Sequence, residues 1–147
     1  MTQHSWPAIA LARACDGPPR VPFVLTDERG PVLGSVALAH LAALREWPDA
    51  FELIAAPDGA PRALALRLPA PVRDARLAQI HARLRDAGLI LAWRDEPYPL
   101  RDRAGGEHAT IERAASRFWG TLTLGAHCNG YVADAAGRPT HLWIARR

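Results

Sequence analysis

Short runs of apolar residues, separated by glycine, proline and aspartate, are the main pattern along this chain. Residues 21–25 and 32–36 form two such runs on either side of a polar turn, which is the pattern of a β-hairpin. Residues 51–56 and 63–68 repeat the pattern around a second turn that contains proline, aspartate and glycine. We therefore predict two strand pairs in the first half of the chain.

Apolar residues at three- and four-residue spacing predict helices elsewhere in the chain. The clearest helix begins at Pro71 and continues to residue 87, with Leu77, Ile80 and Leu84 on one face. The arginines of this segment mostly lie off the apolar face, so we interpret them as a solvated surface. They stand at positions 73, 76, 83 and 85.

Three shorter helices are predicted at residues 6–15, 37–44 and 109–118. Ser35 is placed where it could cap the second of these helices, because a serine side chain accepts a hydrogen bond from the first turn. These segments are short, and each is bounded by turn-forming residues or by an apolar run of strand type.

The apolar runs in the second half of the chain predict further strands. Residues 89–100 have the pattern of a strand that runs into a turn, and a loop follows at residues 101–106. Two runs at residues 121–134 and 140–146 predict a final hairpin around a turn at residues 135–139.

Strand pairs that alternate with single helices favour an α+β fold with a mostly antiparallel sheet and three or four helices. The fold is expected to end in a β-hairpin. We place a domain boundary near Gly120, where the helical pattern gives way to the last hairpin. The chain is thereby divided into residues 1–119 and residues 120–147.

Composition narrows the class of protein. Hydrophobic residues make up 49% of the 147 residues, which is enough for a packed core. No apolar run reaches the roughly 18 residues that a membrane helix needs, so we expect no membrane partner. The first residues lack a basic segment followed by a long apolar core, and we therefore expect a cytoplasmic protein.

The basic residues do not predict a nucleic-acid partner. The formal net charge is +3, and all 18 basic residues are arginine, which is typical of GC-rich coding sequences. Acidic residues are interspersed among the arginines, so no basic stripe forms.

Histidine, cysteine and asparagine stand side by side at residues 127–129 and form a candidate reactive site. Consecutive side chains on a strand point to opposite faces, so we do not expect His127 and Cys128 to form a catalytic pair. The six histidines are scattered along the chain, and no metal site is predicted. We interpret Cys15 and Cys128 as two buried, reduced thiols.

Residues 93–96 form the densest ionic cluster, in which Arg94 follows Trp93 and precedes two carboxylates. Paired carboxylates can bind a metal ion or perform acid–base chemistry, but adjacent side chains on an extended segment diverge. We therefore interpret the cluster as a strand-end turn with a local arginine–carboxylate pair.

Three blocks of the sequence are similar to segments of one family. The last block, IERAASRFWGTLTLGAHCNGYVADAAGRPTHLWIARR, resembles the join between the two domains of the thiamine-pyrophosphokinase-related Nudix hydrolases. AWRDEPYPL and VPFVLTDERGPVLGSV resemble two earlier segments of that family. Trp119, Thr121 and Cys128 depart from its usual residues. The resemblance covers most of the chain and implies an accessory N-terminal domain at residues 1–119 and the first two Nudix strands at residues 120–147.

The same resemblance implies magnesium-dependent hydrolysis of an organic diphosphate such as thiamine diphosphate. Nudix chemistry needs a box of the form G-x5-E-x7-R-E-U-x-E-E-x-G-U, with U apolar, whose glutamates hold the cations that activate water. No R-E-x-x-E-E run occurs in the sequence. We therefore expect this chain to contain no catalytic residue, metal site or cofactor site, and to be inactive alone, with Mg²⁺ bound only by the intact hydrolase.

Two hypotheses follow for the function. In the first, the chain recognises the substrate of such a hydrolase. Arg146 and Arg147 would then bind a phosphate, and Trp93 or Tyr98 would stack on the organic ring; the competing interpretations are a solvent-exposed arginine pair and aromatic residues that only pack. In the second, the chain is a non-enzymatic binding module, or a homodimer formed through the exposed edge of its last sheet.

Overall fold

The computed structural model describes residues 17–124, 128 and 130–143. The predicted helix at residues 6–15, together with Cys15, His127, Arg146 and Arg147, lies outside the described residues. The described part contains three α-helices, one 3₁₀ helix and eight strands.

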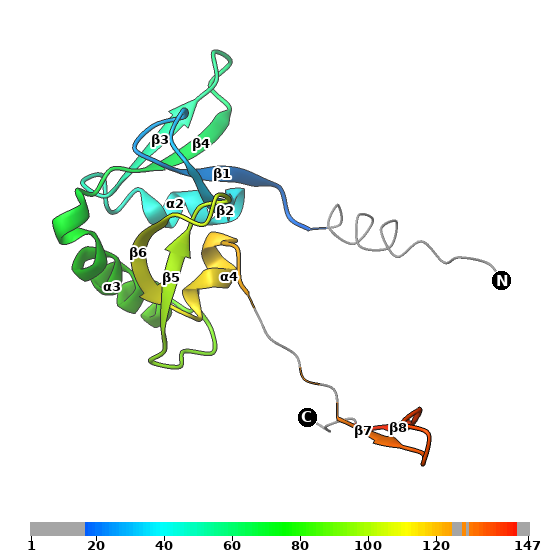
Figure 1. Cartoon of the computed structure of the whole chain (residues 1–147). Helices are drawn as coiled ribbons and strands as arrows, with labels where there is room; N and C mark the ends of the chain where they lie inside the picture. The colour runs from blue at the N-terminus through cyan, green and yellow to red at the C-terminus, as the bar shows by residue number, and fades with distance from the viewer. Residues whose placement is uncertain (1–16, 125–127, 129, 144–147) are drawn as a thin grey trace.

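The largest sheet has four strands in the order β2-β1-β4-β3 (Figure 1). β1 (Arg20–Leu25) pairs antiparallel with β2 (Val32–Ala37). β3 (Phe51–Ala55) pairs antiparallel with β4 (Pro61–Leu66). Both strand pairs that the alternating pattern predicts are therefore confirmed.

A parallel pairing between β1 and β4 joins the two hairpins into one sheet, with Phe23 opposite Leu64. Parallel neighbours need a long crossover between them, and residues 26–60 form it. The alternation of side chains gives the sheet two different faces. Phe23 and Leu64 point into the main core, whereas Ala63 and Ala65 belong to a smaller cluster on the opposite face.

Ser35 does not cap a helix. β2 continues through it, and the helical segment that follows consists only of the 3₁₀ helix η1 (Leu38–His40) and α2 (Leu41–Leu44). The Ser35 hydroxyl instead accepts a hydrogen bond from Arg20 Nε at 2.9 Å. Pairing with β1 therefore outweighs the local preference of serine for a helix cap.

α3 (Ala70–Asp86) confirms the clearest helix prediction. Leu77, Ile80 and Leu84 are buried in the main core, as the spacing of apolar residues predicts. Gly88, at φ +73°, lies just beyond the helix, where a left-handed residue ends the last turn without strain.

The middle of the chain differs most from the prediction. Residues 89–96 form no regular element, and β5 (Pro97–Arg101) follows this segment instead of preceding the turn. β6 (Glu107–Glu112) occupies part of the helix predicted at residues 109–118, and only α4 (Ala115–Trp119) is helical. β5 and β6 pair antiparallel around the predicted loop. The β-branched residues of β6 favour a strand, and this non-local pairing satisfies its backbone.

Arg73 corrects the interpretation of the α3 arginines as a solvated face, because its side chain is buried. Its guanidinium donates to Leu68 O at 2.9 Å and to His108 O at 2.7 Å. The neighbouring Asp74 carboxylate accepts a hydrogen bond from Thr110 N at 3.0 Å. These two side chains therefore bond the backbone of β6 and fix α3 against it.

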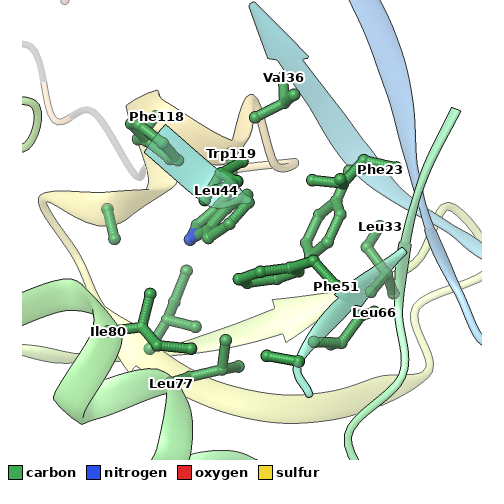
Figure 2. Close-up of a cluster of buried hydrophobic side chains, with 14 of the residues drawn as sticks. Phe23, Leu33, Val36, Leu44, Phe51, Leu66, Leu77, Ile80, Phe118 and Trp119 are labelled. Atoms are coloured by element: carbon green, nitrogen blue, oxygen red, sulfur yellow. The ribbon is translucent and has the colours of Figure 1, made fainter. Parts of the chain in front are cut away.

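Trp119 lies at the centre of the main core and is fully buried (Figure 2). Its ring stacks on Phe23 with centroids 4.5 Å apart, lies 5.3 Å from the Phe51 ring, and meets Phe118 edge-on at 4.8 Å. Its Nε1 donates a hydrogen bond to Nε2 of His81 at 2.8 Å, so the one polar atom of the indole is paired. Trp119 therefore joins β1, β3, α3 and α4 in one core.

Gly34 allows α4 to lie close against β2. A Cβ at this position would be 2.3 Å from Trp119 O, a distance that real contacts do not reach. Gly120 ends α4 in the left-handed region, at φ +52°. Arg20 Nη2 donates to Phe118 O at 3.0 Å and holds the end of α4 against the first hairpin.

The chain's last described elements are β7 (Tyr131–Ala133) and β8 (Pro139–Leu142), which pair antiparallel as a separate two-stranded sheet. All residues of both strands are exposed. The final hairpin is confirmed, although its strands are shorter than the predicted runs. The α+β class with mostly antiparallel sheets is confirmed as well.

The buried pair of His81 and Trp119 predicts a loss of stability in acid. Burial lowers the pKa of His81 from 6.5 to about 4. Between these two values the unfolded chain binds a proton that the folded chain does not, so the free energy of unfolding falls as the pH falls through this window. Between pH 7 and pH 4.5 this one group should cost on the order of 2 kcal/mol.

Urea denaturation at the two pH values, of the protein and of its His81→Gln variant, measures this effect. Glutamine keeps an acceptor for the indole N–H but does not titrate. The variant should therefore lose less stability in acid than the original protein, and an equal loss in both would contradict the assignment to His81.

Candidate functional site

A cavity of about 1030 Å³ lies where the loop at residues 89–94 meets β5, α4 and the segment at residues 121–124 that follows α4. We call this last segment the strap. The residues that line the cavity include three arginines and no aspartate or glutamate. The exposed guanidinium groups belong to its rim, whereas its floor contains the buried residues Ile90, Ser116 and Phe118. The cavity therefore has a basic rim above a neutral floor.

The three rim arginines differ in their partners. Arg113 Nη1 forms an ion pair with Glu96 at 2.8 Å, and this carboxylate raises the pKa of the guanidinium above its ordinary value. For Arg94 and Arg117, the described residues provide no carboxylate partner. At least two guanidinium groups at the rim can thus bind an anion without first breaking an ion pair among the described residues.

Glu112 fixes the loop that carries Arg94. Its carboxylate accepts hydrogen bonds from three backbone N–H groups, those of Arg94 and Glu96 at 3.0 Å and that of Ala114 at 3.2 Å. The same loop holds two non-glycine residues at positive φ, Ala92 at +59° and Asp95 at +56°. Each such residue costs of order 1 kcal/mol, so the loop keeps this course because Glu112 holds it.

The cluster at residues 93–96 does not form a local arginine–carboxylate pair with Arg94. Glu96 pairs with Arg113 instead, from the turn after β6. Trp93 Nε1 donates to Asp95 Oδ1 at 2.7 Å, and its ring lies 4.7 Å from the Arg85 guanidinium of α3. The residues next to Trp93 line the cavity, but Trp93 itself packs toward α3.

Of the two sequence-predicted site residues that the structure describes, Tyr98 lines the cavity and Trp93 does not. Its hydroxyl oxygen accepts a hydrogen bond from Leu124 N at 2.8 Å and so holds the strap against β5. The hydroxyl proton remains able to donate to a ligand. Arg146 and Arg147 lie outside the described residues.

His40 also lines the cavity, and its ring stacks on Phe118 with centroids 4.7 Å apart and planes within 2° of parallel. Burial first, and then the charge of Arg20, lower the pKa of His40 below its ordinary value. This shift favours the neutral imidazole, which presents one donor and one acceptor nitrogen.

Cys128 corrects the interpretation of two buried thiols, because it is exposed and free. Within the part of the chain that the structure describes, no three His, Cys, Asp or Glu side chains gather closely enough to hold a metal ion. Among the same residues, no helix has the length and apolar character needed to cross a membrane.

The rim arginines are the residues that sequence reasoning missed. Arg94 belongs to the ionic cluster at residues 93–96, and Arg113 to the last block that resembles the Nudix family. Arg117 was assigned to the helix predicted at residues 109–118. Nothing local distinguishes these three from the other arginines of the chain. Only the fold brings the loop at residues 89–94 beside α4.

Comparisons with known proteins relate the chain to a family and to two curated proteins. A family model described as a domain of unknown function (DUF4743) matches residues 14–123. The protein named "Nudix hydrolase 20, chloroplastic" from Arabidopsis thaliana is 29% identical over 134 residues, which are 86% of this chain and 34% of that protein. The uncharacterized protein YJR142W of Saccharomyces cerevisiae is 33% identical over 58 residues, 40% of this chain and 17% of that protein.

The chain therefore spans about a third or less of the length of these relatives. The match to the plant protein, which covers most of the chain, establishes a link to a Nudix hydrolase.

We expect Glu112→Ala to destabilise the loop at the cavity rim, because three backbone N–H groups would lose their acceptor. The free energy of unfolding should fall by about 1–3 kcal/mol. Amide hydrogen exchange at Arg94 and Glu96 should become faster. Urea denaturation and exchange monitored by NMR would measure the two effects.

Glu107→Ala is the matched control, at the other end of β6. Its carboxylate forms only an exposed ion pair with Arg101, and such a pair contributes at most about 1 kcal/mol. Equal unfolding free energies in the two variants would contradict the role of Glu112.

Proposed function

This chain belongs to the DUF4743 family, and we propose that it is the accessory, substrate-recognition domain of a Nudix-type hydrolase that acts on an organic diphosphate. The link to the plant Nudix hydrolase supports the hydrolase setting. Thiamine diphosphate is the compound we propose as substrate or close analogue, from the motifs in the last third of the sequence.

The observation that carries this proposal is the basic rim of the cavity. Arg94, Arg113 and Arg117 line it, and no carboxylate does. A diphosphate presents several anionic oxygens that accept hydrogen bonds, and the planar guanidinium group of arginine donates to such oxygens in bidentate fashion. A cavity of about 1030 Å³ is also large enough for a diphosphate with an organic group attached.

In this proposal two domains have different roles, one in substrate binding and one in catalysis. The domain at residues 1–119, together with the strap that follows it, holds the substrate. The hairpin of β7 and β8 is the start of a Nudix domain whose glutamates bind Mg²⁺ and activate water. Arg146 and Arg147, which follow β8 in the sequence, remain proposed as further phosphate ligands. Tyr98 contributes a hydroxyl at the cavity, whereas Trp93 supports the rim loop from the α3 side.

We expect the chain to bind thiamine diphosphate and inorganic pyrophosphate saturably. Arg117→Gln and Arg94→Gln should each weaken both interactions about tenfold or more, because each removes charge-assisted hydrogen bonds worth about 1.5–3 kcal/mol. Isothermal titration calorimetry would measure the dissociation constants.

Arg103→Gln is the control for net charge, since Arg103 is exposed in the turn between β5 and β6, away from the cavity lining. Its affinities should match those of the unchanged protein. Equal affinities in all four proteins, or no binding to the unchanged chain, would contradict the proposal.

The exposed hairpin favours a second candidate function, a non-enzymatic dimerisation module. Leu142 is 65% exposed and Trp143 is 75% exposed, and Tyr131 and Val132 lie exposed on the paired strand. A two-stranded hairpin is marginally stable alone. A second copy of the hairpin could cover these apolar side chains and pair with the open strand edges.

This alternative predicts a dimer of twice 16.0 kDa for the 147-residue chain. Light scattering after size-exclusion chromatography would measure the mass, and Trp143→Lys should shift it to that of the monomer. A monomer for the unchanged chain at high micromolar concentration would exclude the dimerisation module.

A further inference from the structure

Residues that line the cavity carry buried polar atoms without partners. Four buried side-chain nitrogen or oxygen atoms have no hydrogen-bond partner within the described residues. Three of them belong to residues that line this one cavity: His40 Nδ1, Ser116 Oγ and Thr121 Oγ1. A buried polar atom without a partner costs about 1–3 kcal/mol, and such a cost gathered at one place is typical of a site that a ligand completes.

These three atoms belong to uncharged groups that can donate or accept hydrogen bonds. Each hydroxyl can donate and accept, and the neutral imidazole does one or the other at Nδ1 according to its tautomer. No carboxylate lines the cavity, and the nearby charges are arginines. The floor is therefore suited to a neutral group that carries both donors and acceptors, and not to a cation.

We propose that this cavity binds a neutral nitrogen heterocycle through His40, Ser116 and the strap residue Thr121, while the diphosphate of the same ligand lies among the rim arginines. This inference rests on the proposed function, since it assigns the organic half of that ligand. Residues on the floor then select the ring, and residues on the rim bind any diphosphate.

The strap forms one wall of the cavity. Thr121, Thr123 and Leu124 line the cavity from this segment. The strap is bonded to the body through Thr121 N to Ser116 O at 3.1 Å and through Leu124 N to Tyr98 Oη at 2.8 Å. Thr121 belongs to the strap and Ser116 to α4, and both hydroxyls are buried; the proposal therefore requires the strap to move outward when the ring enters.

An apolar chain is the main competing occupant, because Ile90 and Phe118 also belong to the floor. An aliphatic tail would gain from burial against these side chains. It would however leave the three polar atoms unpaired, whereas a heterocycle satisfies them and keeps contact with the Phe118 side of the floor. The two occupants therefore differ in their response to removal of the hydroxyls.

Three probes separate the two ends of the cavity: inorganic pyrophosphate, thiamine diphosphate, whose aminopyrimidine is a neutral heterocycle, and geranyl diphosphate, whose tail is apolar. We expect Ser116→Ala and Thr121→Val each to weaken thiamine diphosphate binding about three- to tenfold. Pyrophosphate binding should change by less than about twofold, and geranyl diphosphate binding should stay equal or improve. Calorimetric titration measures all three affinities.

Thr110→Val is the matched control, a threonine of β6 that does not line the cavity. A second readout needs no variant: long-range ¹H–¹⁵N NMR should show a shift of His40 Nδ1 on addition of thiamine diphosphate and little shift with pyrophosphate. This NMR measurement still tests whether the heterocycle binds beside His40 if the Ser116 or Thr121 variant fails to fold.

The outcomes distinguish this inference from the proposed function. The heterocycle site is overturned if geranyl diphosphate binds more tightly than thiamine diphosphate and the His40 signal does not move. If pyrophosphate binding still depends on Arg117 in that case, the diphosphate site stands. If neither pyrophosphate nor thiamine diphosphate binds the unchanged chain, the proposed function fails, and the heterocycle site fails with it.

Discussion

Burial of the Trp119 indole is the interaction on which the rest of the structure depends. The ring stacks on Phe23 and lies against Phe51, which brings β1 and β3 into contact with α4. Its N–H needs an acceptor when buried, and His81 of α3 supplies it. α4 has only five residues, too few for a helix to persist by itself in water. It exists because its last residue is held in the core.

The cavity follows from this docking. Once α4 is fixed, its successive residues diverge around the helix: Trp119 points into the core, Phe118 and Ser116 reach the cavity floor, and Arg117 reaches the rim. Gly34 permits the approach, because any Cβ there would collide with the Trp119 carbonyl. The basic rim is thus built on the same short helix that closes the core. A change in core packing would therefore also change the position of the rim arginines.

Local sequence reasoning succeeded where one pattern dominates and failed where distant segments decide. The first two hairpins show a period of two residues and α3 a period of three to four residues, and all three elements were predicted. The first residues of the helix expected over residues 109–118 belong to β6 instead, because pairing with β5 and bonds from Arg73 and Asp74 satisfy their backbone. Of the residues proposed from the sequence, Tyr98 lines the cavity and Trp93 packs toward α3, whereas nothing in the sequence distinguished the rim arginines from the others.

The sequence by itself determined the α+β class, the strand pairs, the longest helix and the final hairpin, because these depend on alternation and spacing within a few residues. The motifs in its last third also pointed to the Nudix link. Only the tertiary structure decided that one parallel pairing joins the hairpins, that Arg73 is buried, and that His40, Arg94 and Arg117 meet at one cavity. These arrangements depend on contacts between residues that are far apart in the sequence, and the local spacing of apolar residues carries no information about such contacts.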